Sequence, residues 1–197
     1  MLGIKDLIYR YRHNRGYGVQ SPYAFHFVTS VIAEKHAYYA YPSINKAAKK
    51  CGYKAARARL LFRMTNYVRP RTIMMYAPCE AVVCAVSMAR PSAQTYLFSG
   101  DATAEEKLKS VLRQEQTLGL LYVGDTPACA SVVQHAIEYA SIDSMIVIEG
   151  IHRSREMESF WHEIKQNTAV AVTFDLYSMG VLFFDKSYKK QHYTLKK

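Results

Sequence analysis

The segment 142–184 constrains the fold more than any other part of the chain. An apolar run at 144–149 ends in an acid, Glu149, and leads into a polar loop at 150–155. A helical pattern follows, with apolar residues at intervals of three and four that share one face: Met157, Phe160, Trp161 and Ile164. Two β-rich runs, at 170–175 and 180–184, complete the segment. This order of elements predicts the closing half of an open α/β sheet, whose ligands bind at the carboxyl ends of the strands.

The preceding residues predict the other elements of such a sheet. We expect strands at 72–76, 95–98 and 118–123, separated by helices at 81–88, 104–114 and 128–139. Further upstream, Ser21 and Pro22 are the residue types that open a helix. We expect that helix to bury Phe25, Val28, Val31 and Ile32. The fold class is therefore α/β, with a largely helical N-terminal part.

A long basic helix is expected between these two parts. It would run from residue 44 or 47 to residue 67 and end before Arg69 and Pro70. Its inward face would contain Leu60, Leu61 and Met64. Its basic residues would point mostly outward: Lys49, Lys50, Lys54, Arg57, Arg59 and Arg63.

Length and composition are compatible with one compact unit. The chain has 197 residues, half of them hydrophobic, which is enough for one substantial core. We expect a helical basic cap at 1–70 and an α/β core at 71–197. No apolar run approaches the ~20 residues of a membrane span, and no long apolar segment near the N-terminus resembles a secretory signal. The four cysteines lack metal-ligand spacing, which favours reduced thiols in a cytoplasmic protein.

The positive charge is concentrated in the first third of the chain. Residues 1–71 contain 14 Lys and Arg against Asp6 and Glu34, whereas the rest has 12 basic and 14 acidic residues. Nine of the 16 tyrosines also lie in this region. Interleaved cations and aromatic rings suit nucleic acid, and the charge alone suits an anionic membrane surface. The alternative, which we favour, is a solvated basic face with tyrosines in half-buried packing sites.

Two motifs resemble a known family. Glu-Gly-Ile-His-Arg-Ser at 149–154, with Val-Thr-Phe-Asp-Leu at 172–176, resembles the C-terminal third of small class I S-adenosylmethionine (SAM)-dependent methyltransferase-like proteins from Bacteroidetes-type bacteria. Those proteins usually read Asp-Asp-Ile-His-Trp-Ser at the first motif. Gly-Val-Gln-Ser-Pro-Tyr at 18–23 resembles their opening, Gly-Ile-His-Ser-Pro-Phe. The resemblance implies a Rossmann-like sandwich with a mostly parallel sheet, a C-terminal antiparallel hairpin and a helical N-terminal cap.

The resemblance also implies where SAM would bind, and the chain departs from the family there. The loop after the first strand usually has an acid and glycines that let the backbone approach the cofactor. Here it reads Tyr-Ala-Pro-Cys-Glu at 76–80, without glycine. Glu80 would bring a negative charge to the cofactor's carboxylate, or serve only as a first-turn helix acid. Ser99 stands where an acid would bind the ribose, and Asp101 either replaces it or, as we favour, caps the next helix.

Two further departures concern the middle of the chain. Between Asp101 and Leu120 there is room for one helix, whereas the family pattern has a helix, a strand and a loop at the adenine. Gly124 and Asp125 stand near the family's Asp-Gly pair. The implied cofactor edge therefore consists of Tyr76, Ala77, Cys79, Glu80, Ser99, Asp101 and Asp125. With these departures we expect SAM binding to be weakened or lost.

Glu149 and His152 are the candidates for catalysis. With Asp125 they would gather at one sheet edge, where a carboxylate pair and a histidine suit general-base chemistry or a divalent ion. The alternative for His152, which we favour, is a hydrogen bond at a helix start, and no metal is expected because the spacing matches no metal motif. The segment at 16–25 is either a lid over this edge or a docking element of the cap.

Two functions compete on this sequence. The first is a SAM-dependent methyltransferase or, as we favour, its non-catalytic descendant, with a methyl acceptor that the sequence does not identify. The second is a binding protein that uses the basic, tyrosine-rich N-terminal region to hold nucleic acid or an anionic surface. Steep salt dependence would favour the second function.

Overall fold

The computed structural model describes residues 21–101 and 103–195, and in this part of the chain seven strands form one sheet. Their order across the sheet is β2-β1-β3-β4-β6-β5-β7. The first four run parallel, β6 is antiparallel to both β4 and β5, and β7 is parallel to β5. The bounds are β1 (Thr72–Tyr76), β2 (Gln94–Phe98), β3 (Leu118–Val123), β4 (Ala140–Glu149), β5 (Val172–Asp175), β6 (Met179–Phe183) and β7 (Gln191–Thr194).

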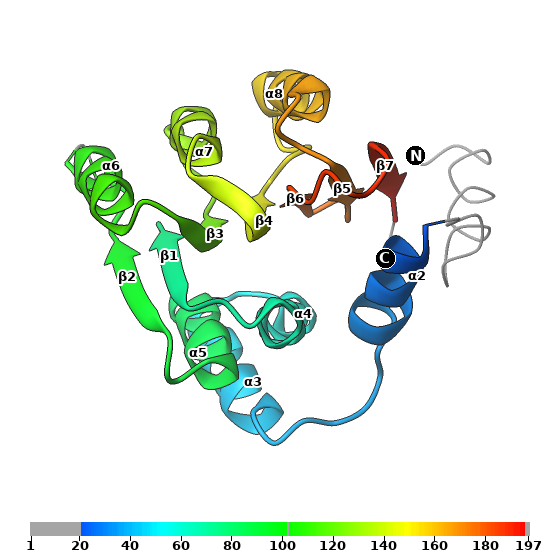
Figure 1. Ribbon diagram of the computed structural model, residues 1–197. Helices are drawn as coiled ribbons and strands as arrows, with labels where there is room; N and C mark the ends of the chain where they lie inside the picture. Colours follow the sequence, from blue (N-terminus) through cyan, green and yellow to red (C-terminus); the bar gives the residue numbers. More distant parts are fainter. Residues whose placement is uncertain (1–20, 102, 196–197) are drawn as a thin grey trace.

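Helices cover both faces of the sheet (Figure 1). One face carries α6 (Ala104–Glu115), α7 (Cys129–Ile137) and α8 (Arg155–Gln166). The other carries α2 (Pro22–Phe27), the π-helix η1 (Val28–Ile32), α4 (Ala55–Val68) and α5 (Glu80–Ala89), with α3 (Tyr41–Cys51) packed outside α4 and α5. The predicted α/β sandwich is confirmed. None of the described helices is long and apolar enough to cross a membrane.

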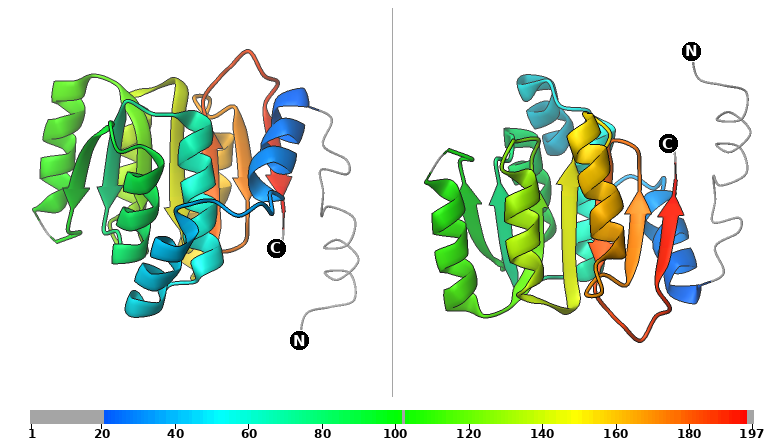
Figure 2. Two further views of the ribbon diagram at one scale, coloured as in Figure 1. Left: turned by 90° about the horizontal axis from the view of Figure 1, so that it is seen from below. Right: turned by 90° about the horizontal axis from the view of Figure 1, so that it is seen from above.

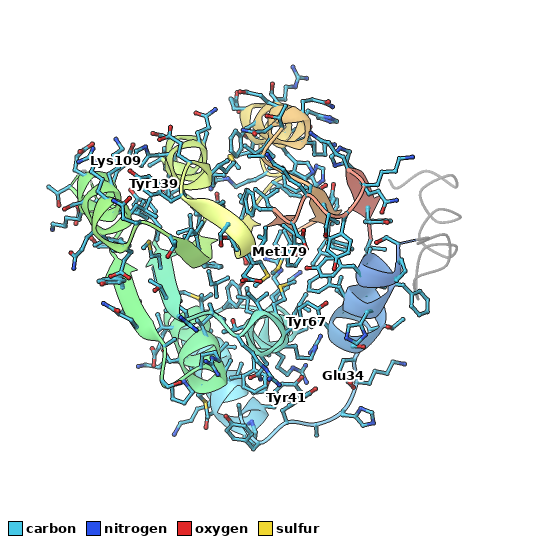
Figure 3. All side chains as sticks on the ribbon, viewed as in Figure 1. Glu34, Tyr41, Tyr67, Lys109, Tyr139 and Met179 are labelled. Atoms are coloured by element: carbon cyan, nitrogen blue, oxygen red, sulfur yellow. The ribbon has the colours of Figure 1, made fainter. Side chains whose placement is uncertain are left out.

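Alternating side chains of the buried strands build two cores. Met74, Leu121 and Ile146 face α6, α7 and α8. Their strand neighbours Met75 and Val147 face α4, α5 and η1. Met179, labelled in Figure 3, lies in this second core between the sheet and α4. Because both faces are covered, these strands read as nearly continuous apolar runs, which is why the sequence identified them.

The middle of the chain is as short as predicted. Between β2 and β3 the described residues form α6 and no further strand. In consequence β2 is an edge strand, paired on one side with β1. Its Leu97 side chain is 57% exposed, a high value for leucine in a sheet.

The prediction of one long basic helix is wrong. The chain forms α3 and α4 as separate helices, because Gly52 adopts a left-handed conformation with φ of +69° at the end of α3. The Tyr53 N–H then donates to the Ala48 carbonyl, which is a typical helix C-cap arrangement. A new helix begins at Ala55. The break turns Tyr53 toward the sheet edge.

Two side chains of the helical part are placed differently from the prediction. Phe25 is 48% exposed, because the buried stripe of α2 and η1 passes through Ala24, Phe27 and Val28 instead. Arg63 is only 7% exposed, although we expected it to point outward. Its Nε donates to the Val31 carbonyl at 2.6 Å, so the cation binds a carbonyl of η1.

The predicted antiparallel hairpin is confirmed as β5 and β6, but it is not the last element. The chain continues to β7, which pairs with β5 at the edge of the sheet. The sequence of β7, Gln-His-Tyr-Thr at 191–194, lacks the apolar alternation that marks a half-buried strand, so it was missed.

Candidate functional site

A cavity of about 510 Å³ opens at the carboxyl ends of β1, β3 and β4. The chain leaves β1 toward β2 on one side and returns to β3 on the other, so this is the switch point where open α/β sheets bind ligands. The lining residues come from the strand ends and from the start of α4: Tyr53, Arg57, Ala77, Cys79, Tyr122, Gly124, Asp125, Glu149, Gly150, His152, Arg153, Tyr177 and Ser178.

The loop after β1 has a backbone shape that favours glycine, although alanine occupies it. Ala77 has φ of +49°, in the left-handed region. Its N–H donates to the Phe98 carbonyl at 2.8 Å, and the Gly124 N–H donates to the Tyr76 carbonyl at 2.8 Å. A Cβ on Gly124 would lie 2.2 Å from the Ala77 carbonyl oxygen, and a Cβ on Gly100 would lie 2.8 Å from the Ala77 Cβ. The neighbouring loops therefore hold Ala77 in place by close backbone contact.

Glu149 ends β4 and lies at the bottom of the cavity, 6% exposed. The Tyr53 hydroxyl donates to its Oε1. Arg57 Nη1 lies 3.6 Å from its Oε2. Burial raises the pKa of Glu149 above its ordinary value, and the Tyr53 hydrogen bond and the Arg57 charge only partly oppose that effect.

The tyrosines around Glu149 keep their hydroxyl protons. Burial raises the pKa of Tyr53 and of Tyr122, and the nearby Glu149 charge adds to both shifts. Tyr53 also shares a hydrogen bond with the Tyr122 hydroxyl. The three side chains form a continuous polar network whose carboxylate is satisfied from within the protein.

His152 is held by two carboxylates. Its Nε2 lies 2.7 Å from Asp175 Oδ2, and its Nδ1 lies 3.2 Å from Glu158 Oε1. The ring stacks on Tyr177, with centroids 5.6 Å apart. Both ring nitrogens therefore face a carboxylate, and the two contacts fix the orientation of the ring. In this arrangement the His152 side chain joins the loop after β4 to α8 and to the end of β5.

Asp125 is neutralised by the loop that follows β4. Arg153 Nη1 lies 2.6 Å from Asp125 Oδ2. Gly150, with φ of +70°, brings that loop close, since a Cβ there would lie 3.2 Å from the Asp125 carboxyl carbon. The acids of the cavity are therefore paired, and within the described residues no group of three or more His, Cys, Asp or Glu could hold a metal ion.

Cys79 lines the cavity at the N-cap of α5 and contacts a second thiol. It shares a hydrogen bond with Cys51 at the end of α3. Burial raises the pKa of Cys79. At Cys51, burial alone would raise the pKa of the thiol. Hydrogen bonds from the Ala81 and Tyr53 backbone and from Cys79 outweigh burial, so the pKa of Cys51 is lowered.

Five of the nine site residues selected from the sequence meet at the cavity: Ala77, Cys79, Asp125, Glu149 and His152. The other four do not line it: Tyr76, Glu80, Ser99 and Asp101. Tyr76 is buried in the core below α6, and Glu80 lies 2.9 Å from Lys50 Nζ. Asp101 accepts hydrogen bonds from the Thr103 and Ala104 N–H groups at 2.8 and 3.0 Å, and from the Ser99 hydroxyl. These bonds cap the start of α6 and lower the pKa of Asp101.

Several lining residues were not selected from the sequence, and two of them, Tyr53 and Arg57, belong to the helical cap. Tyr53 reaches Glu149 across 96 positions of sequence, a contact that no local spacing reveals. One signal in the sequence was Gly52, because a glycine inside a helical pattern often marks a C-cap and a turn.

Comparison with known proteins bears on the fold. No protein-family model matches the chain, and no curated protein matches its sequence. One similar solved structure is a putative O-methyltransferase from Klebsiella pneumoniae, with 9% identity and a TM-score of 0.54, covering 79% of this chain and 94% of that one. Another is the methyltransferase PaMTH1 from Podospora anserina with S-adenosylhomocysteine (SAH) bound, with 8% identity and a TM-score of 0.56, covering 84% of this chain and 96% of that one. A third is the O-methyltransferase TomG from Streptomyces achromogenes in complex with SAM, with 10% identity and a TM-score of 0.51, covering 76% of this chain and 91% of that one. At these identities the likeness shows the fold alone, which is the Rossmann-like fold of class I methyltransferases.

Proposed function

We propose that this chain is a diverged methyltransferase-like protein in which SAM binding is weakened or lost. The observation that carries the proposal is the state of the cofactor edge. Ser99 donates a hydrogen bond to Asp101, and Asp101 accepts one from Ala104 at the start of α6, outside the cavity. A cofactor ribose at that edge would have to break a helix cap to obtain its acceptor.

The cavity residues fit only part of SAM. The left-handed Ala77 and the close Gly124 retain the backbone turn that such cofactors approach. However, the loop after β1 has no glycine, and no strand of the described residues lies beyond β2 to shape an adenine site. We therefore propose no methyl-transfer step for this cavity.

The cavity is better suited to binding than to catalysis. Glu149 is buried and satisfied by Tyr53, and both nitrogens of His152 face carboxylates. No unengaged general base follows from this geometry. Arg57 and Arg153 give the cavity two cations, each with one carboxylate partner, so a small polar ligand that competes for these pairs is the ligand class that we propose.

Calorimetric titration with SAM and with SAH tests this proposal. We expect no heat and no thermal stabilisation at millimolar ligand, because a ligand far below its dissociation constant leaves stability unchanged. Micromolar binding to the unmodified chain would refute the proposal.

A designed variant shows how far the site has diverged. Ala77→Gly removes the Cβ and keeps the backbone turn that glycine favours. Ala93→Gly, the same change in the turn before β2, is the matched control. We expect Ala77→Gly to strengthen SAH binding relative to the control. Equal binding by both variants would mean that the loop is not what limits the cofactor.

A further inference from the structure

The exposed face of α3 is a row of lysines. Residues 21–71 contain ten Lys and Arg and a single acid, Glu34. Lys46, Lys49 and Lys50 stand at i, i+3 and i+4, so they share one side of the helix, and all three are exposed. Lys54, also exposed, follows in the turn to α4. We call these four residues the lysine track.

The lysine track adjoins the cavity. Figure 2 shows α3 beyond the end of the sheet toward which β5 and β7 point, which is the end where the cavity opens. Tyr53 precedes the last residue of the track, and Arg57 comes one helical turn after it. Both line the cavity. A polymer bound along α3 would therefore pass the cavity mouth.

Most of this charge is not neutralised within the protein. Lys50 pairs with Glu80 at 2.9 Å. Lys46, Lys49 and Lys54 form no ion pair with any of the described residues. Like charges three and four residues apart on a helix destabilise it by a few tenths of a kcal/mol per pair. An external polyanion would remove that repulsion, because its phosphates would provide the missing counter-charges.

The side chains around the lysine track favour nucleic acid over a lipid surface. Besides lysine, the exposed residues of α3 are Pro42, Ser43, Asn45 and Cys51, so this face has no large apolar side chain to insert into a bilayer. Tyr39, two residues before α3, is 75% exposed, although its hydroxyl donates to the Met88 carbonyl at 2.8 Å. A ring held in this way can stack on a base.

We propose that the lysine track binds the phosphate backbone of a single-stranded nucleic acid. Lys46 and Lys49 are about 4.5 Å apart along the helix axis, close enough to contact neighbouring phosphates of one strand. Single strands are the better match, since an exposed tyrosine ring stacks on unpaired bases. This function does not depend on SAM, so its test is independent of whether the cofactor edge binds SAM.

Fluorescence anisotropy on the full chain tests the proposal, with a labelled single-stranded RNA of about 20 nucleotides, longer than the usual site size. The three unpaired lysines of the track predict a slope of about −2 from their phosphate contacts when log affinity is plotted against log salt. Lys46→Ala combined with Lys49→Ala and Lys54→Ala should flatten the slope by about 2 and weaken binding at low salt by roughly tenfold or more.

The control is a triple variant with the same loss of charge elsewhere. Lys107, Lys186 and Lys189 are exposed and lie on α6 and in the loop before β7, so Lys107→Ala, Lys186→Ala and Lys189→Ala should leave the slope nearly unchanged. Thermal unfolding of both variants confirms that each folds. Equal losses in the two variants, or no RNA binding by the parent chain, would overturn the proposal. Binding to phosphatidylserine vesicles in place of RNA would also overturn it and would assign the track to membranes.

Discussion

The hydrogen bond from Tyr53 to Glu149 makes a prediction about stability and pH. Tyr53→Phe removes the hydroxyl and leaves the ring in place. When Glu149 is ionised, the lost bond has a charged acceptor and should cost about 2 kcal/mol. When Glu149 is protonated, the bond joins two neutral groups and its loss should cost about 1 kcal/mol. The free-energy cost of the substitution should therefore grow by about 1 kcal/mol between about pH 4 and about pH 8.

The sign follows from the direction of the pKa shift. Burial raises the pKa of Glu149 in the folded protein, so the folded state holds a proton that the unfolded chain releases. The stability contributed by this group is complete below the ordinary glutamate pKa of about 4.3 and is lost as pH rises through the folded-state pKa. Tyr53→Phe removes an interaction that lowers this pKa, so the pKa of Glu149 rises further in the variant.

Urea unfolding at the two pH values measures the effect. Tyr39→Phe is the matched control, because the Tyr39 hydroxyl donates to a backbone carbonyl and no titrating group is involved. Its cost should be about 1 kcal/mol at both pH values. A Tyr53→Phe cost that is the same at both pH values, or larger in acid, would refute the assignment of this bond to an ionisable acceptor.

Two further substitutions test the packing described above. Gly180→Ala should destabilise the fold by about 3 kcal/mol, because its Cβ would lie 2.5 Å from Trp161 in a filled core. Gly52→Ala, whose Cβ would have nothing within 4 Å, should cost only the left-handed backbone penalty of about 1 kcal/mol. Equal melting temperatures of the two variants would contradict this ranking. Arg63→Met should lower the free energy of unfolding in urea by about 3 kcal/mol, because the Val31 carbonyl loses its buried donor. A neutral or stabilising effect would show that desolvation of the cation outweighs its hydrogen bonds.

The sequence predicted the fold better than the position of individual side chains. Strands 72–76 and 118–123 were predicted to the residue, because buried parallel strands are continuous apolar runs bounded by helical patterns. The error at Gly52 has a clear origin: periodicity continues across it, and only the left-handed cap separates two helices. The polar strand β7 is fixed by pairing with β5, which no local pattern encodes.

The site was predictable in outline only. Glu149, Asp125 and Ala77 meet because parallel strands end at the same edge, and that follows from topology. Tyr53 and Arg57 arrive from a helix pair whose docking depends on tertiary contacts, so no spacing in the sequence points to them. The pairing of His152 with Asp175 likewise joins residues 23 positions apart, so no local pattern points to it.

The left-handed Ala77 has a consequence for the energy stored in this turn. The backbone has a shape that glycine favours although the residue is alanine, because Gly100 and Gly124 approach it closely. Alanine in this conformation carries a penalty of about 1 kcal/mol that glycine would not carry. The rest of the fold therefore supports a local strain, and the conformation of the turn is set by its neighbours more than by its own residue.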